Sequence, residues 1–197
     1  MSLAESRALY RQEGDATLIE LRLSSIHQLF DSFDPAPFPE RSLDNEAEDY
    51  IVSSARDIAV HEPIKLVFYL PPDQLTLTET TGLADAIHNY FNYRLAMAQR
   101  ALRHQRREGR ITLAIGLAFL FGCITLRQLV YTIDRGTLAQ IIAEGLLISG
   151  WVAMWRPLSL FLYEWWPIKR SCAVFTKLAA VPVDVRPVAE APIALRH

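Results

Sequence analysis

The chain of 197 residues is long enough for one domain or two small modules, and its net charge of −2 identifies no partner because the charge is sorted along the sequence. Residues 1–98 carry sixteen acidic and seven basic side chains. Cys123 and Cys172 are the only cysteines, which excludes a disulfide framework and suits a reducing cytoplasm. Residues 1–15 lack the basic-then-apolar order of a cleavable secretion signal.

The first predicted elements form a small β-α-β unit. Residues 17–23 alternate in the two-residue period of a strand with one buried face, and a proline-rich loop follows at 31–42. Asp44 then caps a predicted helix that ends at His61-Glu62-Pro63. Residues 64–70 are a near-continuous apolar run, which predicts a buried second strand.

A second helix is predicted from about Glu79 through the arginine-rich segment, with Gly109 as a potential hinge. Its apolar stripe comprises Leu83, Ile87, Phe91, Leu95, Ala98 and Leu102. His88 lies off this stripe and is predicted to be a helix-surface residue. Residues 181–185 are predicted to return as a third strand, which the proline inside it confines to a sheet edge.

The element order predicts an α+β membrane protein, with a small β-α-β-α cytoplasmic head, a third strand from the C-terminus and a transmembrane helical hairpin. The predicted segments are the head at 1–98, a basic juxtamembrane helix at 99–110, transmembrane helices at 111–133 and 136–155, an interfacial amphipathic segment at 156–180, and a strand and tail at 181–197. Because so small a head buries little apolar surface, we expect a homo-oligomer.

The two predicted spans are uncharged or nearly so over the length that a bilayer requires. The competing interpretation is a pair of buried core helices in a soluble protein. Positive charge flanks both outer ends, so the positive-inside rule predicts an inner-membrane protein with both termini in the cytoplasm. The basic residues before the first span, Arg100, Arg103, Arg106, Arg107 and Arg110, are predicted to contact anionic lipid headgroups. Nucleic acid is disfavoured because no aromatic residues are interleaved with them.

Aromatic residues cluster where the second span leaves the predicted bilayer. Trp151, Trp155, Trp165 and Trp166 are predicted to be interfacial anchors, with a cation-binding aromatic cage as the alternative. After a bend at Pro157, residues Leu158, Phe161, Leu162 and Trp165 are predicted to form one face of an interfacial helix.

Glu144 is an ionisable residue inside the second predicted span, and such residues are costly in a bilayer. Counted from the turn at 134–135, Arg127 lies at a similar depth on the first span. An ion pair between Glu144 and Arg127 would lock the hairpin. The alternative is that Glu144, Gln140 and Arg127 line a proton or cation path between subunits.

No constellation of a known catalytic or metal-binding kind is recognisable in the sequence, and no cofactor or metal is predicted. Histidines are scattered without zinc spacing. The acidic stretch at 31–49 offers oxygen ligands to a divalent cation, but a solvated loop and helix N-terminus account for it more simply. A membrane-tethered enzyme is a third hypothesis, because isolated carboxylates can take part in catalysis.

Several motifs resemble a family of uncharacterised bacterial membrane proteins. They are Pro37-Phe38, Leu43-Asp44, Glu48, Tyr50-Ile51, Trp155-Arg156-Pro157 and the stretch 162–168, LYEWWPI. The resemblance implies bacterial origin and a similar layout, and no activity that carries over. We therefore expect a non-enzymatic, membrane-anchored interaction, scaffold or regulatory protein that associates with itself or an unidentified protein partner. The alternative is a subunit of a small oligomeric channel or transporter with Glu144 in its pathway.

Overall fold

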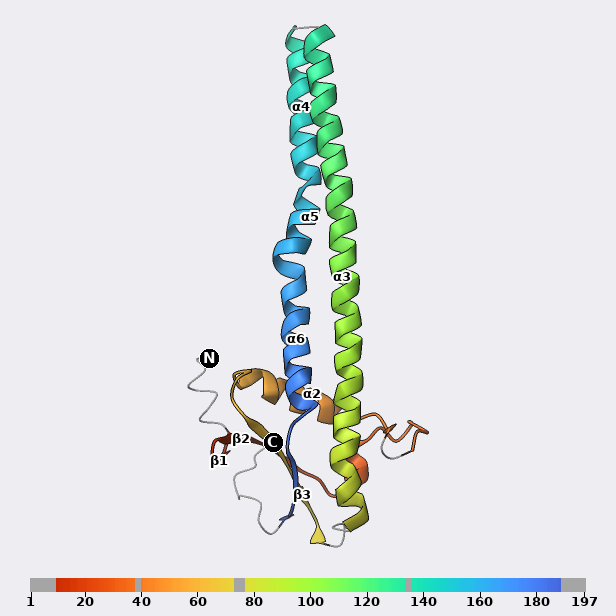
Figure 1. Cartoon of the computed structure of the whole chain (residues 1–197), viewed down its shortest axis with the longest axis vertical. Helices are drawn as coiled ribbons and strands as arrows, with labels where there is room; N and C mark the ends of the chain where they lie inside the picture. Colours follow the sequence, from red (N-terminus) through yellow and green to blue (C-terminus); the bar gives the residue numbers. More distant parts are fainter. Residues whose placement is uncertain (1–9, 38–39, 73–76, 134–135, 189–197) are drawn as a thin grey trace. The chain divides into compact units, whose positions relative to one another are not determined.

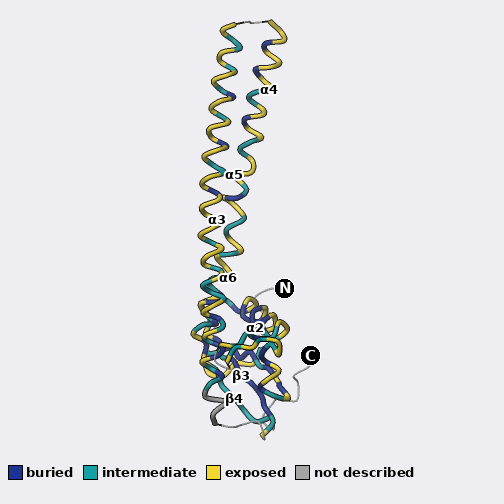
Figure 2. Tube along the Cα trace, turned by 90° about the vertical axis from the view of Figure 1, so that its right-hand side faces the viewer, coloured by how far each residue is buried: buried dark blue, intermediate teal, exposed yellow. Residues whose placement is uncertain are grey.

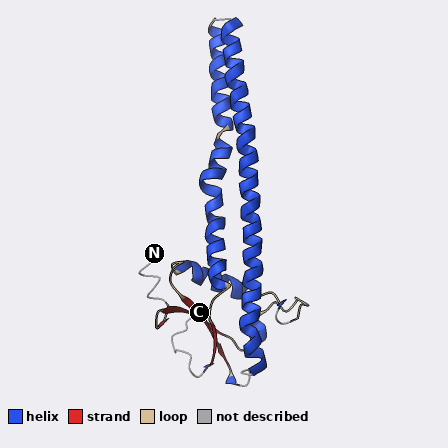
Figure 3. Cartoon of the chain, viewed as in Figure 1, coloured by secondary structure: helices blue, strands red, loops and turns tan. Residues whose placement is uncertain are grey.

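The computed structural model of the chain describes residues 10–37, 40–72, 77–133 and 136–188. They divide into two compact units (Figure 3). The head unit contains the described strands and comprises residues up to Met97 together with those from Ser171 onwards. The second unit, from Ala98 to Arg170, is mostly helical in its described part.

The head unit is built on a mixed four-stranded sheet in the order β1-β2-β3-β4. Strands β2 (Ala16–Arg22), β3 (Ile64–Leu70) and β4 (Val183–Pro187) are parallel, and the short β1 (Gln12–Glu13) pairs antiparallel with β2. All three strands predicted from the sequence are therefore confirmed, with the C-terminal one at an edge. The β1 strand was not predicted, since two residues before Gly14, which has φ 63°, carry no periodic signal.

The connection from β2 to β3 contains a short 3₁₀ helix, η1 (Ile26–Leu29), and helix α2 (Asn45–Asp57). Asp44 caps α2 as predicted, because its side chain accepts a hydrogen bond from the Glu46 backbone N–H at 2.9 Å. The helix ends at Asp57, one turn before the predicted end at His61-Glu62-Pro63.

Helix α3 (Leu77–Ile133) runs without interruption through the arginine-rich segment. The predicted hinge at Gly109 is therefore wrong, since one glycine costs a helix only about 1 kcal/mol and does not break it. In the head portion of α3, Leu83, Ile87 and Phe91 are fully buried, which confirms the start of the predicted stripe.

Residues 134 and 135 lie outside the described part, and beyond them the chain returns through four described helical segments. They are α4 (Thr137–Ala153), α5 (Trp155–Ser159), the π-helical turn η4 (Leu160–Glu164) and α6 (Trp165–Leu178). The interruption at Met154 lies three residues before Pro157, which has no backbone N–H to continue the ladder of hydrogen bonds.

By length and composition alone, two helical stretches could cross a membrane: 82–133, with 52 residues, and 137–178, with 42. Only 11% and 17% of their most apolar windows is buried within the chain. The core helices of a soluble protein are mostly buried by their own chain, whereas these stretches are mostly exposed. Their apolar surface needs cover from lipid or from another protein.

Candidate membrane and interaction surfaces

Small residues form the contact between the two long helices of the second unit, which lie side by side (Figure 1). On α3, Gly116 and Cys123 are buried seven residues apart, and on the return Ala143, Gly150 and Pro157 repeat the same interval. A seven-residue interval keeps side chains on one seam of a helix pair. This repeat was not predicted, although its spacing is visible in the sequence.

Gly150 tests this contact, because a Cβ there would lie 2.8 Å from Leu120 Cδ1 and 3.3 Å from Cys123 Cβ. We expect Gly150→Leu to destabilise the helix pair by about 1–3 kcal/mol through overpacking. Gly145 on the same helix is the matched control, since a Cβ there meets nothing within 4 Å. SDS titration with energy transfer between labels on α3 and α4 measures both. Equal loss from Gly150→Leu and Gly145→Leu would contradict this packing.

The outward surface of α4 is exposed and mostly apolar (Figure 2). Its exposed large hydrophobic residues are Leu138, Ile141, Ile142, Ile148, Trp151 and Val152. Two polar side chains, Gln140 and Glu144, interrupt this surface, and both are exposed. Neither side chain forms a hydrogen bond or ion pair with the described residues.

The predicted ion pair between Arg127 and Glu144 is not formed within the single chain. The Arg127 guanidinium lies 5.2 Å from the ring centroid of Tyr131 on its own helix instead. The depth count matched the two residues along the helices but ignored rotation about each axis. Ala143 lies in the helix contact, and the next residue, Glu144, is turned about 100° away from it.

The predicted lipid-contacting arginines are all exposed on α3, and they are Arg100, Arg103, Arg106, Arg107 and Arg110. The carboxylate of Glu164 on the return segment is engaged by other groups. It accepts from Gln105 Nε2 at 3.0 Å and forms an ion pair with Arg156 at 3.3 Å. None of the five arginines forms an ion pair with a described residue, so they can bind an anionic partner.

Three of the predicted anchors, Trp151, Trp155 and Trp166, are exposed. Trp165 is half-buried, and its indole Nε1 donates to the Phe161 carbonyl at 2.7 Å. Lys169 Nζ lies 5.5 Å from the centroid of the Trp165 ring. The four tryptophans lie along the return segment, and the described residues form no aromatic cage around a cation there.

The apolar face predicted for the segment after Pro157 is exposed at Leu158, Phe161 and Leu162, whereas Pro157 and Leu160 are buried. The Phe161 ring still lies beside α3, 3.9 Å from the position of a Cβ at Gly109. The π-helical turn η4 adds a residue to the turn and thereby changes which side chains face α3.

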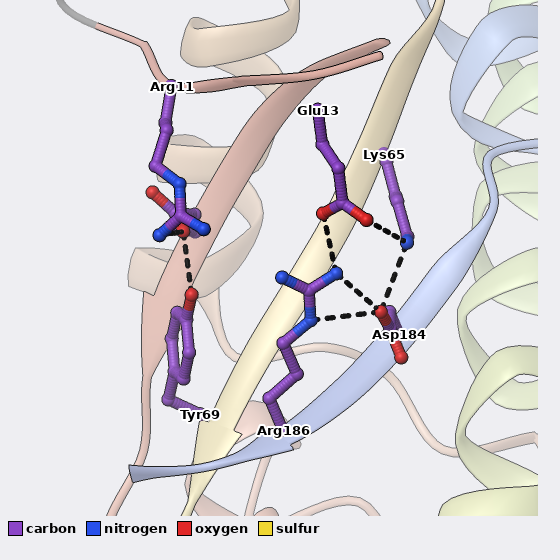
Figure 4. A network of polar contacts seen from close by, with 7 residues as sticks. Arg11, Glu13, Lys65, Tyr69, Asp184 and Arg186 are labelled. Carbon is purple, nitrogen blue, oxygen red and sulfur yellow. Dashed lines mark hydrogen bonds and ion pairs between the residues drawn. The ribbon is translucent and has the colours of Figure 1, made fainter. Parts of the chain in front are cut away.

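The head carries a network of charges on one face of the sheet, with α2 on the far side (Figure 4). Glu13 and Asp184 each pair with both Lys65 and Arg186, at 2.6–3.6 Å. The network joins β1, β3 and β4. Beside it, the Tyr69 hydroxyl donates to Glu20 at 2.7 Å.

The network makes head stability depend on pH. The hydrogen bond from Arg186 lowers the pKa of Glu13; burial opposes the shift at Asp184, but hydrogen bonds from Lys65 and Arg186 lower its pKa as well. Stabilisation by groups with lowered pKa is present above their ordinary values, 4.5 and 3.8, and is lost as pH falls through the folded values. We expect Glu13→Gln/Asp184→Asn to be less stable than the wild type at pH 7, by a difference that shrinks as the pH falls below 3.8. Urea unfolding in detergent across this range measures the difference, and a constant difference would contradict the assignment.

A second polar cluster joins the helices of the head. Glu48 of α2 is only 7% exposed, and its carboxylate binds Arg94 and the Tyr90 hydroxyl of α3, both at 2.5 Å. Burial and this hydrogen bond raise the pKa of Tyr90. The Arg94 guanidinium also lies over the ring of Phe175 in α6, at 5.6 Å. The prediction that Glu48 belongs to a solvated acidic surface is wrong, because its partners come from a helix distant in sequence.

His88 is also more than a helix-surface residue. Its Nε2 lies 2.8 Å from the carbonyl oxygen of Val181, in the segment that leads into β4. This contact connects α3 to the C-terminal strand within the head unit.

The rest of the acidic stretch serves local structure. Asp34 accepts hydrogen bonds from the backbone N–H groups of Ala36 and Ser42, which lower its pKa. Among the described residues, no three His, Cys, Asp or Glu side chains lie close enough to hold a metal ion. Nearby, an open groove of about 860 Å³ lies where β2 ends, lined by polar residues such as Arg22, His27 and Asp44.

Comparison of the chain with protein-family models, curated proteins and solved structures gives no match.

Proposed function

We propose that the chain is a non-enzymatic interaction protein anchored in the bacterial inner membrane, where residues 111–155 span the bilayer and the head remains cytoplasmic. The exposed apolar surface of the long helices supports a lipid environment. The arginines before the first span, and Arg156, Lys169 and Arg170 after the second, support cytoplasmic ends for both.

The observation that carries the proposal of self-association is the exposed pair of Gln140 and Glu144. Residues four apart lie on the same side of a helix. An ionisable side chain in a bilayer almost always faces protein or water, and the described chain supplies no hydrogen bond or ion pair to Glu144. A second copy supplies amide and carboxyl partners from the same two positions, so this stripe is the contact between copies.

The head would then present its surface to a cytoplasmic partner. The groove at the end of β2 offers mixed charge, and Phe33 in the adjoining loop is 92% exposed. Aromatic side chains are enriched in protein interfaces, so Phe33 adds apolar surface that such a partner could cover.

Energy transfer between donor-labelled and acceptor-labelled chains in lipid vesicles tests self-association. We expect the wild type to associate and Gln140→Leu/Glu144→Leu to associate about tenfold more weakly, since buried hydrogen bonds between helices are worth about 0.6–2 kcal/mol each. Thr125→Leu is the control, because the Thr125 hydroxyl is exposed but donates to the Phe121 carbonyl of its own helix at 2.8 Å. A wild type that stays monomeric at every lipid dilution would disprove self-association.

The channel alternative rests on the same exposed Glu144. Glu144→Gln separates the two functions, because glutamine keeps the hydrogen bonds and removes the titratable charge. Cation flux in vesicles that is present in the wild type and lost in Glu144→Gln, with association intact, would favour the channel.

A further inference from the structure

A groove of about 530 Å³ lies within the second unit, between α3 and the segment around η4. Arg106, Gly109 and Arg110 line it from α3, and Leu160, Phe161 and Trp165 line it from the return. Gln105 also lines the α3 side, so one wall is polar and cationic and the other is apolar. Gly109 keeps the groove open, because only the Phe161 ring lies near the position of its missing side chain, at 3.9 Å.

The two arginines of the cationic wall have no ion-pair partner among the described residues. Arg106 and Arg110 are one helical turn apart and exposed, and neither forms an ion pair or side-chain hydrogen bond with the described residues. The nearest acidic segment of the return contributes Glu164, whose oxygens are taken by Gln105 and Arg156. Both guanidinium groups can therefore bind one anion, because Glu164 is bonded to Gln105 and Arg156 and not to them.

The apolar wall is equally short of partners. Phe161 is 50% exposed, and the only polar atom of the Trp165 side chain is already bonded to the Phe161 carbonyl. The ring of Trp165 therefore offers an apolar surface beside the two arginines. A ligand that matches both walls carries an anionic group next to a hydrocarbon chain.

We propose that this groove is a binding site for one anionic phospholipid, whose phosphate lies between Arg106 and Arg110 and whose acyl chain lies along Phe161 and Trp165. The site rests on the proposed membrane insertion. The groove-lining residues of α3 directly precede residue 111, where the first proposed span begins. Two arginines and hydrophobic contact distinguish it from general attraction of a basic helix to a charged surface. Free inorganic phosphate has no group for the apolar wall.

Native mass spectrometry of protein extracted from phosphatidylglycerol/phosphatidylcholine vesicles tests the site. We expect one retained phosphatidylglycerol per wild-type chain and about thirtyfold weaker retention by Arg106→Ala/Arg110→Ala. Arg103→Ala/Arg107→Ala is the matched control, since it removes the same charge from the same helix outside the groove. Gly109→Leu should also lose the lipid, because it fills the groove and leaves every charge in place.

Equal loss from the two double-arginine variants would overturn the site and leave only diffuse surface attraction. Retention by Gly109→Leu at the wild-type level, or displacement of the lipid by millimolar inorganic phosphate, would overturn it too. Flotation of the same vesicles separates this failure from that of the proposed function. A wild type that floats without retained lipid overturns the site alone, whereas a wild type that does not float overturns both.

Discussion

Phe91→Ala is expected to destabilise the head by about 3–5 kcal/mol, the usual cost of removing a buried aromatic side chain. Phe91 is fully buried in α3, and its ring stacks on that of Phe175 in α6 with centroids 6.4 Å apart. A domain of this size has a total stability of about 5–15 kcal/mol, so the loss approaches complete unfolding. Hydrogen exchange in detergent measures it through the protection of the β3 amides.

Tyr93→Ala provides the control for this substitution. Tyr93 lies two residues further along α3 and is 60% exposed, so its removal should change stability by no more than about 0.5 kcal/mol. Equal loss of β3 protection in Phe91→Ala and Tyr93→Ala would contradict the packing of the head around Phe91.

Glu48→Ala is expected to cost about 1.5–3 kcal/mol, the range for hydrogen bonds to charged groups. The value stays below that of a fully buried pair because the Arg94 side chain is 40% exposed and water can solvate it after the change. Glu48→Gln should lose less, since its amide oxygen still accepts from Tyr90. Urea unfolding monitored by hydrogen exchange measures both variants.

The control for Glu48 is Glu46→Ala. Both carboxylates lie in the first turn of α2 and interact similarly with the helix dipole, but Glu46 is exposed. The difference between the two variants therefore isolates the buried contacts of Glu48. Equal destabilisation by Glu48→Ala and Glu46→Ala would show that only the helix dipole matters.

Elements with a local signal could be predicted from the sequence. The apolar run at 64–70 became β3 with the same bounds, and Asp44 capped α2, because both patterns depend on neighbouring residues. The fold of the second unit followed from helix length and apolar composition. The seven-residue repeat that includes Gly116 and Gly150 could also have been predicted from sequence spacing.

Contacts between distant residues could not be predicted in this way. Glu48 and Tyr90 are separated by 42 positions, and Arg186 and Glu13 by 173, so no local pattern relates them. The predicted Arg127–Glu144 ion pair was wrong for a related reason. Counting residues gives the depth of a side chain along a helix, but it does not give the direction in which the side chain points around the helix axis. The position of a charged residue in the sequence therefore does not identify its ion-pair partner, whereas a continuous apolar run does predict a buried strand.

Single-cysteine labelling in spheroplasts tests the proposed membrane topology. In a background of Cys123→Ala/Cys172→Ser, the exposed positions His27 in the head and Thr137 at the start of α4 are replaced separately by cysteine. A membrane-impermeant maleimide is expected to label Thr137→Cys in intact spheroplasts and His27→Cys only after the membrane is opened. Labelling of both positions before opening, or of His27→Cys alone, would contradict a hairpin that crosses the membrane with its head in the cytoplasm.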